Sequence, residues 1–448
     1  MSKDTELTAT ESTAAETKLT TTATELTAAA LPSGFAWGAV RAGIKASGKT
    51  DLAAAVVLKN KAGAPTAGGV AVAAAMYTSN RVVAAPVTVG RQHLLTTGGR
   101  VAAVLVNAGN ANCATGAPGI AGCKSTCVAA AESFGCIFDE VFPSSTGIIG
   151  VPFPAEKVVA AMPELKASLG SSAENAESFA RAIMTTDTRV KMAYATVAAG
   201  EADPAQNGLQ VKIWGAAKGA GMIHPRLGEP VGPPHATMLV YLFTDVAASA
   251  EDLNAALRAA VQPSFNSISI DGDTSTNDTV LLLASGASGA TLSKALAPAF
   301  ETALGEVCRS LARQIVDDGE GVGHVVTLDI QGAATDDDAR LVAKAIAHSP
   351  LCKTAWSSAD PNWGRLLAAA GYSGANFEME KTRIRIGDQE VFEYGVRAAS
   401  FDEAKAHAAM MEREYTIRID LGAGAGECKF LTCDLTAEYV SINADYST

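Results

Sequence analysis

Residues 101–134 read VAAVLVNAGNANCATGAPGIAGCKSTCVAAAESF. The first part, residues 101–106, is a short apolar run typical of a buried strand, and residues 120–134 have the apolar spacing of a helix. Short apolar runs and helical stretches keep alternating from residue 31 onward. This alternation predicts an α/β protein built from layered helices and mixed sheets.

Five further stretches have the pattern of amphipathic helices. They are residues 156–169, 173–183, 250–261, 298–316 and 336–346. Residues 382–386 and 390–394 are joined through Gly387 and Asp388, which predicts a β-hairpin and hence partly antiparallel sheets. Residues 226–235, RLGEPVGPPH, hold three prolines and two glycines, and we expect an exposed loop there.

Length, charge and cysteine usage narrow the class of protein. A chain of 448 residues with 48% hydrophobic and 18% charged residues is typical of a compact enzyme of two or three packed units. The net charge of -12 argues against nucleic acid or an anionic membrane as a partner, and no apolar run approaches the ~20 residues of a membrane helix. The eight cysteines form no CxxC pair and no zinc-site spacing. We expect reduced thiols, no metal and no secretion.

Residues 1–30 consist almost entirely of Ser, Thr, Ala, Glu and Leu, and we expect them to form a disordered tail. This segment has five acidic residues and only two basic ones, Lys3 and Lys18, whereas a transit peptide is basic and poor in acidic residues. The expected compartment is the cytoplasm, and the interior of a plastid or mitochondrion stays open as an alternative.

Two motifs match ligand-binding loops only in part. GIKASGKT at residues 43–50 fits the phosphate-loop pattern, but no apolar run precedes it, and DLAAAVVLK after it is typical of a strand rather than a helix. DGDTSTND at residues 271–278 begins like a calcium loop but lacks the glycine and the final glutamate of one. We therefore expect neither nucleotide nor calcium binding, and interpret residues 271–278 as a polar active-site loop.

A longer set of motifs occurs in a family-specific order. The motifs are GIKASGKTDLA from Gly43, TSNRVVAAPV from Thr78, NAGNANCATG from Asn107, SSTGIIG from Ser144, IMTTDT from Ile183, AKGAGMIHP from Ala217, ATML from Ala236, FNSISIDGDTSTNDT from Phe265, SPLCKTA from Ser349, DPNWGR from Asp360 and CDLTAEYVSINADYST at the end. The set covers nearly all of residues 31–448. It resembles the ornithine acetyltransferases, or bifunctional glutamate N-acetyltransferases, the ArgJ family of arginine biosynthesis.

This resemblance implies a self-processing, N-terminal-nucleophile-type enzyme with the DmpA/ArgJ-like fold. It implies cleavage between Ala236 and Thr237, which would give an alpha chain of residues 31–236 and a beta chain of residues 237–448. The alpha chain would carry the oxyanion site, and the beta chain would begin with the nucleophile Thr237. Two chains of each kind are expected to form a heterotetramer.

Cleavage would also supply a base. A threonine hydroxyl is neutral at pH 7 and needs a base to take its proton. The α-amino group freed on Thr237 has a reference pKa of ~8 and can accept that proton. The tetrahedral oxyanion needs donors already in place, a role that the resemblance assigns to Thr146 and Gly147. It assigns substrate contacts to Thr185, Lys218, Thr237, Glu320, Asn443 and Thr448.

The implied reaction moves acetyl from N2-acetylornithine to glutamate by a ping-pong route through acetyl-Thr237. No cofactor is required, and acetyl-CoA stays open as a second acetyl donor. Both substrates carry carboxylates and amines, for which Lys218 and Glu320 offer partners of opposite charge.

Two departures from the family pattern lie near the site. The family's Glu-Gly-Ala-Thr is here Glu-Gly-Val-Gly at residues 320–323, and ten residues, 226–235, stand where the family has two between a proline and the Ala-Thr pair. Because cleavage needs tight geometry, an unprocessed, non-catalytic chain is one alternative. An N-terminal-nucleophile amidohydrolase is another, if water removes the acyl group from the nucleophile.

Overall fold

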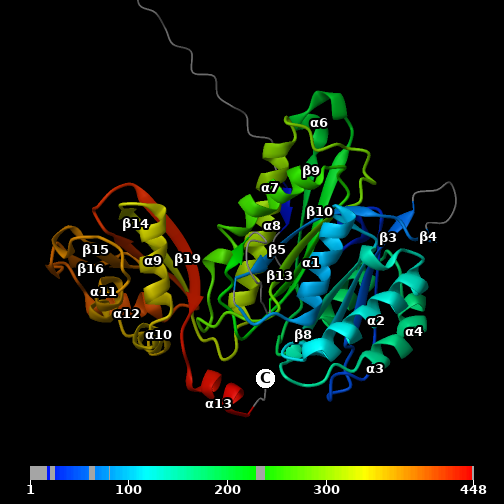
Figure 1. Ribbon diagram of the computed structural model, residues 1–448. Coiled ribbons are helices and arrows are strands. Elements are labelled where there is room, and N and C mark those ends of the chain that lie inside the picture. Colours follow the sequence, from blue (N-terminus) through cyan, green and yellow to red (C-terminus); the bar gives the residue numbers. More distant parts are fainter. Residues whose placement is uncertain (1–17, 21–25, 60–65, 80, 229–237, 446–448) are drawn as a thin grey trace, which may run out of the picture.

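A computed structural model of the protein describes residues 18–20, 26–59, 66–79, 81–228 and 238–445. These residues form three β-sheets with helices on their outer faces. Two sheets lie face to face in a larger body, and the third, with its own helices, stands beside them (Figure 1). The prediction of an α/β fold with layered helices and mixed sheets is confirmed.

The first sheet of the larger body has eight described strands. In spatial order they are β1 (Lys18–Thr20), β9 (Lys191–Ala198), β10 (Gln210–Lys218), β12 (Leu239–Thr244), β13 (Thr279–Ala284), β5 (Ala71–Thr78) and β11 (Leu227–Gly228), with β6 (Arg100–Val101) also paired to β5. β12 and β13 run parallel, whereas their outer neighbours β10 and β5 are antiparallel to them. Both central strands are buried along their whole length, as expected for apolar runs covered on two faces.

The second sheet packs against the first. Its strands are β2 (Phe35–Val40), β3 (Leu52–Lys59), β7 (Ala103–Asn110) and β8 (Val141–Ile148), and β4 (Thr66–Ala67) pairs with β3. Aromatic rings fill the space between the two sheets, with the ring of Trp37 lying 5.2 Å from that of Trp214 and 5.6 Å from that of Phe243. The strand β2 corrects the interpretation that no strand precedes residue 43, because Ala36 and Gly38 are buried like the larger apolar residues of the strand.

Helices cover the outer faces of both sheets, so the larger body has four layers. α7 (Ala250–Val261) and α8 (Ala297–Asp317) pack on the first sheet, and α2 (Gly116–Phe134), α3 (Ala155–Ala160) and α4 (Met162–Ala167) on the second. α1 (Ala85–Thr97) lies against β8, α5 (Ala173–Ala182) lies against β2, and α6 (Ala199–Ala202) follows β9. The helix predicted at residues 156–169 is two helices, since Pro163 stands in the first turn of α4 and starts a new one.

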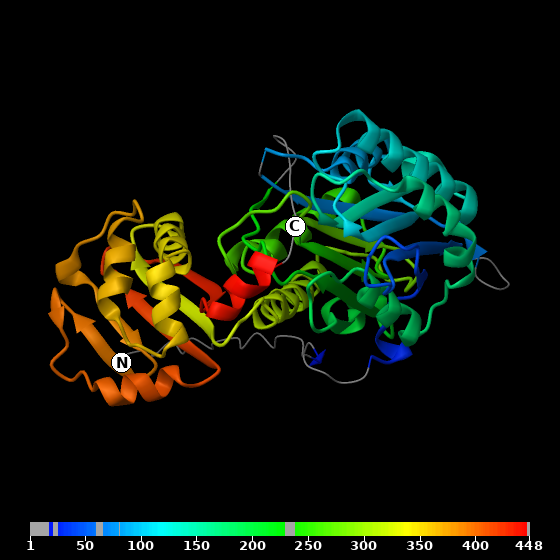
Figure 2. The same cartoon turned by 90° about the horizontal axis from the view of Figure 1, so that it is seen from below.

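The third sheet has the order β17 (Val396–Arg397), β16 (Gln389–Glu393), β15 (Arg383–Ile386), β18 (Glu414–Asp420), β14 (Val325–Ala333) and β19 (Gly426–Cys433). One core joins it to α9 (Asp336–Ala347), α10 (Pro350–Ser357), α11 (Trp363–Gly371) and α12 (Glu403–Met410). The predicted hairpin is β15 and β16, turning at Gly387 with φ of 54°. After β19 the chain returns toward the larger body as α13 (Ala437–Asp445) (Figure 2).

Short 3-10 helices complete the described secondary structure. They are η1 (Ala28–Ala30), η2 (Phe138–Glu140), η3 (Pro204–Gln206), η4 (Phe265–Ser267) and η5 (Met379–Lys381). All eight cysteines are free thiols. Among the described residues, no helix has both the length and the apolar character needed to span a membrane.

Two segments differ from their sequence-based interpretation. Within the predicted tail, β1 pairs with β9 and η1 leads into a buried Leu31, so ordered backbone begins before residue 31. Within residues 226–235, Leu227 is buried and exchanges hydrogen bonds with the Asn266 amide at 2.7 and 2.9 Å. The prediction of an exposed loop is therefore wrong at Leu227, and residues 229–235 lie outside the described residues.

Candidate active site

A cavity of about 300 Å³ lies where the two sheets of the larger body meet α13. Its walls contain five of the residues implied to form the site, each from a different segment of the chain: Gly147, Thr185, Lys218, Glu320 and Asn443. Thr146 is buried and in hydrogen-bond contact with Lys218. Ala236, Thr237 and Thr448 lie outside the described residues. The structure thus brings together all the implied site residues that it describes.

The implied oxyanion pair, Thr146 and Gly147, lies near the end of strand β8. Gly147 has φ of 131°, and a Cβ there would lie 2.3 Å from the carbonyl carbon of Gly109 on β7, so only glycine fits. Thr146 Oγ1 accepts a hydrogen bond of 3.2 Å from Lys218 Nζ, and both side chains are buried. Lysine can only donate while it is protonated, so the hydroxyl hydrogen of Thr146 remains to be given to another acceptor.

Asp187 organises the wall that carries Thr185 and Lys218. Its carboxylate accepts hydrogen bonds from the backbone N–H of Thr185 at 2.9 Å and from that of Gly219 at 2.6 Å. Lys191 Nζ lies 2.6 Å from Asp187 Oδ1 and 2.5 Å from Asp318 Oδ2, which makes a buried network of one cation and two anions. The positions of Thr185 and of the chain after Lys218 therefore depend on one side chain.

Burial and neighbouring charges have opposite effects on the pKa values of the ionisable groups in this wall. Burial alone would raise the pKa of the Asp187 carboxyl, but Lys191, Lys218 and the Gly219 N–H together hold it below its ordinary value. Burial lowers the pKa of Lys218, and the nearby carboxylates of Asp187, Asp278 and Glu320 counteract this effect. The cavity thus places a buried amine next to carboxylates, an arrangement common at catalytic sites.

The opposite wall joins the C-terminal helix to Glu320. Asn443 of α13 donates a hydrogen bond of 2.9 Å to Glu320 Oε2, and Tyr439 Oη donates one of 3.3 Å to Asp271 Oδ2. A Cβ on Gly221 would lie 2.4 Å from Glu320 Oε2, so glycine leaves the space that this carboxylate occupies. These contacts give a physical basis for a role of the C-terminal segment in the site.

Despite the departure at residues 320–323, Glu320 lies in the cavity wall with the other implied site residues. Gly321 is retained, has φ of 67°, and approaches α13 so closely that a Cβ would lie 2.5 Å from Tyr439 N. The changed position Gly323 instead faces Asp434, whose carboxylate accepts a 2.9 Å hydrogen bond from its N–H. Glu320 itself is held through its own N–H, which donates to Ala220 O at 2.9 Å.

The phosphate-loop pattern has a different explanation. Residues 43–50 connect β2 to β3, and the backbone N–H groups of Ala42, Ile44 and Lys45 donate to the buried carboxylate of Asp51 at 2.6, 2.5 and 2.8 Å. An internal anion thus occupies the donors that a phosphate would need, and a strand follows instead of a helix. The loop at residues 271–278 does contribute Asp271 and Asp273 to the cavity, as the polar-loop interpretation expects.

Sequence reasoning missed the network of Asp187, Lys191 and Asp318. The sequence feature that could have pointed to Asp187 is its place in the IMTTDT motif. Asp318 lies 127 residues from its partner Lys191, and no spacing rule connects them.

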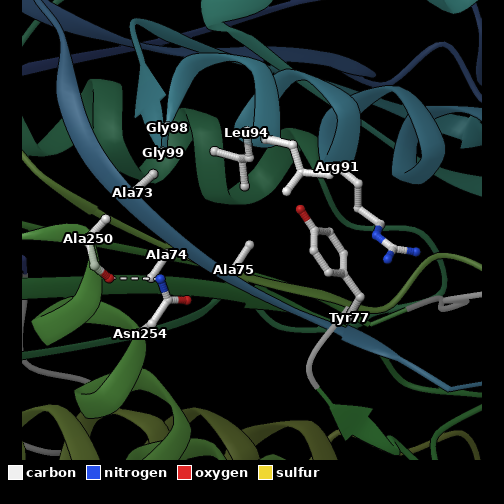
Figure 3. A pocket seen from close by; sticks show the side chains of 11 residues that line it. Ala73, Ala74, Ala75, Tyr77, Arg91, Leu94, Gly98, Gly99, Ala250 and Asn254 are labelled. Atoms are coloured by element: carbon white, nitrogen blue, oxygen red, sulfur yellow. Dashed lines mark hydrogen bonds between the residues drawn. The ribbon is translucent and has the colours of Figure 1, made fainter. Parts of the chain in front are cut away.

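A second cavity, of about 270 Å³, lies elsewhere, at the edge of β5 between α1 and α7. Arg91 and Tyr77 lie at one end of it and Gly98 and Gly99 at the other (Figure 3). It contains none of the residues implied by the sequence, and its walls are mainly apolar. We place the candidate active site in the first cavity.

Residues 36–448 match the sequence model of the ArgJ family. The arginine biosynthesis bifunctional protein ArgJ of Methylococcus capsulatus is 41% identical over 421 residues, which cover 93% of this chain and 95% of that protein. The protein of the same name from Thermus thermophilus is 43% identical over 418 residues, covering 93% and 99%. The chain belongs to the ArgJ family.

A solved structure, ornithine acetyltransferase complexed with ornithine from Mycobacterium tuberculosis, is 33% identical in the matched part. The match covers 48% of this chain and 100% of that chain, with a TM-score of 0.38.

Proposed function

We propose that this protein transfers acetyl from N2-acetylornithine to glutamate through an acetyl ester on Thr237, in the cyclic route of arginine biosynthesis. The observation that carries the proposal is the meeting of Gly147, Thr185, Lys218, Glu320 and Asn443 in one cavity. Membership of the ArgJ family, through whose motifs these residues were identified, is consistent with the same reaction.

Self-cleavage comes first. The Thr237 hydroxyl attacks the carbonyl carbon of Ala236, and the acyl group moves from the Thr237 nitrogen to its oxygen. Water then hydrolyses this ester, leaving a carboxylate on Ala236 and a free amine on Thr237. The new amine is the base for all later turnovers, because its pKa is close to neutrality.

Acetyl transfer then takes two half-reactions. The Thr237 amine takes the hydroxyl proton while the oxygen attacks the acetyl carbonyl of N2-acetylornithine. The C–N bond breaks, the proton passes to the departing amine, and ornithine leaves an acetyl ester behind. The α-amine of glutamate attacks that ester in the second half-reaction, and the Thr237 oxygen regains its proton as N-acetylglutamate leaves.

The polar residues of the cavity have separate tasks in this scheme. The Gly147 N–H and the Thr146 hydroxyl donate to the oxyanion, and Lys218, by donating to Thr146 Oγ1, leaves that hydroxyl free to do so. Thr185 and Asn443 contact the substrate. A substrate amine is attracted by Glu320 and a substrate carboxylate by Lys218. The residues Ala236, Thr237 and Thr448 take part by resemblance to the family.

The scheme needs no cofactor. Acetyl-CoA stays open as a second acetyl donor, and measuring the rate of acetyl transfer with each donor decides whether it is used. We place the two cleaved chains in a heterotetramer with two copies of each. A reducing compartment, the cytoplasm or an organelle interior, suits the eight free thiols.

Two measurements on purified protein test the proposal. Intact mass should give fragments of residues 1–236 and 237–448. Acetyl transfer from N2-acetylornithine to labelled glutamate should show parallel lines in double-reciprocal plots, as a ping-pong route requires. A single uncleaved mass together with no transfer would favour the non-catalytic alternative, and release of free acetate without glutamate would favour the amidohydrolase.

A further inference from the structure

Asn277 connects the loop at residues 271–278 to the oxyanion strand. Its side chain is buried, and its two amide hydrogens go to the carbonyl oxygens of Ala111 at 2.6 Å and Ser145 at 2.7 Å. Ser145 directly precedes Thr146, and β8 is the last strand of its sheet, so its outer edge lacks a described neighbouring strand. Asn277 therefore pairs a carbonyl at that edge that would otherwise be buried without a partner.

Asp278, the next residue, connects the same loop to the first sheet. Its carboxylate, also buried, accepts a hydrogen bond from the backbone N–H of Met238. The N–H of Thr279 donates to the Met238 carbonyl at 2.9 Å, so Met238 is held from both sides. Met238 follows Thr237 in the chain and leads into β12.

Two adjacent side chains therefore hold two strands from different sheets. One hydrogen-bonds the residue before the implied oxyanion pair, and the other hydrogen-bonds the residue after the implied nucleophile. Because Asn277 and Asp278 share a peptide bond, neither strand can shift relative to the other without breaking one of these contacts.

We infer that Asn277 and Asp278 are positioning residues, which together set the distance between the Thr146–Gly147 oxyanion site and the start of β12. This inference rests on the proposed function, since it takes Thr237 as the nucleophile. Reactions of this kind lose about 10²-fold in rate when a reacting group is misplaced by about 1 Å. A shift of β8 against β12 would therefore reduce both self-cleavage and kcat, while the cavity residues that contact substrate stay in place.

The first test compares Asn277→Ala with Thr276→Val. The Thr276 hydroxyl donates to Asn277 Oδ1 at 2.7 Å but contacts neither carbonyl, so Thr276→Val removes a support of the Asn277 amide and leaves both of its hydrogen bonds able to form. We expect Asn277→Ala to lower kcat and the rate of fragment appearance by about 10²-fold with KM nearly unchanged. Thr276→Val should lower both rates by less than Asn277→Ala does, because it keeps the two amide hydrogen bonds to the carbonyl oxygens. Equal rates for Asn277→Ala and wild type contradict the inference.

The second test compares Asp278→Ala with Asp278→Asn. Asparagine keeps an oxygen that accepts from the Met238 N–H, and alanine does not. Asp278→Asn should recover most of the cleavage rate and kcat that Asp278→Ala loses. If the two variants are equally impaired, the hydrogen bond to Met238 does not explain the role of Asp278, and the inference fails for that residue.

A double-mutant cycle separates positioning from mere stability. If Asn277 acts through the Thr146–Gly147 site, adding Asn277→Ala to Thr146→Ala should lower kcat by less than the about 10²-fold expected in the wild-type background, because only the Gly147 N–H is then left to be positioned. Independent, multiplying losses would overturn the inference. Wild-type protein that neither cleaves nor transfers acetyl would contradict the proposed function and the inference with it, whereas active wild type with active variants contradicts the inference alone.

Discussion

Lys218 Nζ donates a hydrogen bond of 3.2 Å to Thr146 Oγ1, and this buried pair joins the end of β10 to the end of β8. The ammonium group polarises the hydroxyl and leaves its hydrogen available for a developing oxyanion. The pair therefore connects a residue implied to bind substrate with one implied to stabilise the transition state. Mutations of Thr146 should therefore affect the rate more than the binding, whereas mutations of Lys218 should affect both.

Thr146→Ala is expected to lower kcat by about 10²-fold or more with a smaller effect on KM, because one oxyanion donor is lost. Thr146→Ser keeps the hydroxyl and should retain most of the activity. Steady-state kinetics of cleaved enzyme decide this. A wild-type kcat in Thr146→Ala would exclude its hydroxyl from the oxyanion site.

Thr237→Ala should remain full length and inactive, since it has no nucleophile, and Thr237→Ser should cleave slowly, since it keeps the hydroxyl with altered packing. Intact mass over time gives both results. Reducing and non-reducing gels of wild type should look alike, because the cysteines are free. A smaller wild-type fragment that begins anywhere but at Thr237 would refute the cleavage assignment.

Shortening the segment before Ala236 should speed cleavage. Replacing residues 226–235 by the family's Asn-Met restores the family spacing, but it also removes the buried Leu227, whose side chain is worth about 1.5–3 kcal/mol. Replacing residues 229–235 alone keeps strand β11. We expect faster fragment appearance in both variants and a lower Tm in the first. Equal cleavage rates in both variants and wild type would show the extra residues to be neutral.

Asp187→Asn should be destabilising, because it leaves the buried Lys191 with one anion instead of two; since Asp318 remains, the loss should be smaller than the about 3–5 kcal/mol expected when a buried charge loses its only partner. Asp420→Asn is the matched control, since the Asp420–Arg383 pair is partly exposed and such pairs contribute about 0–1 kcal/mol. Urea unfolding of both variants provides the comparison. Similar losses of free energy of unfolding would mean that the Asp187 network does little for stability.

The pair His224 and His348 predicts an acid-sensitive fold. Their rings lie 4.3 Å apart, and burial lowers the pKa of His224 from 6.5 to about 3 and that of His348 from 6.5 to about 4. Below pH 6.5 the unfolded chain binds protons that the folded one does not, so stability rises with pH up to about 6.5 and falls as pH drops toward 4.

Each neutral histidine contributes a slope of about 1.4 kcal/mol per pH unit in that window. His348→Gln should therefore flatten the dependence of the free energy of unfolding on pH between 6.5 and 4, and leave its shape above pH 7 unchanged. Unfolding curves at a series of pH values measure this. An unchanged slope in the variant would mean that His348 does not titrate differently in the folded state.

The sequence predicted elements whose side chains follow a regular period. The α7 bounds match the predicted residues 250–261, and the β15–β16 hairpin forms at the predicted turn. The strand β2 was missed because alanine and glycine contribute little to an apolar pattern. In the structure, Gly38 lies so close to Ser168 that a Cβ at Gly38 would be 2.5 Å from the Ser168 hydroxyl. Such tight packing becomes visible only once the neighbouring segment is placed.

The site residues likewise fall into those that the sequence predicted and those that it did not. Thr185, Lys218, Glu320 and Asn443 were found through short motifs that resemble the family, and the cavity brings them together. Asp318, by contrast, acts through a lysine 127 residues away, and its contacts depend on how α8 packs against β9. Long-range hydrogen bonds of this kind have no local sequence signature.

The order of strands in the first sheet has a consequence for how the protein folds before and after cleavage. β12 and β13 belong to the part after residue 237, yet β10 and β5, from the part before it, flank them on both sides. A chain cut at that point would be two polypeptides woven into one sheet. Folding before the cut would be that of a single chain, whereas refolding after the cut would need two chains to meet at a rate that depends on concentration. The durability of the mature protein would then depend on how slowly it unfolds, rather than on how readily it refolds.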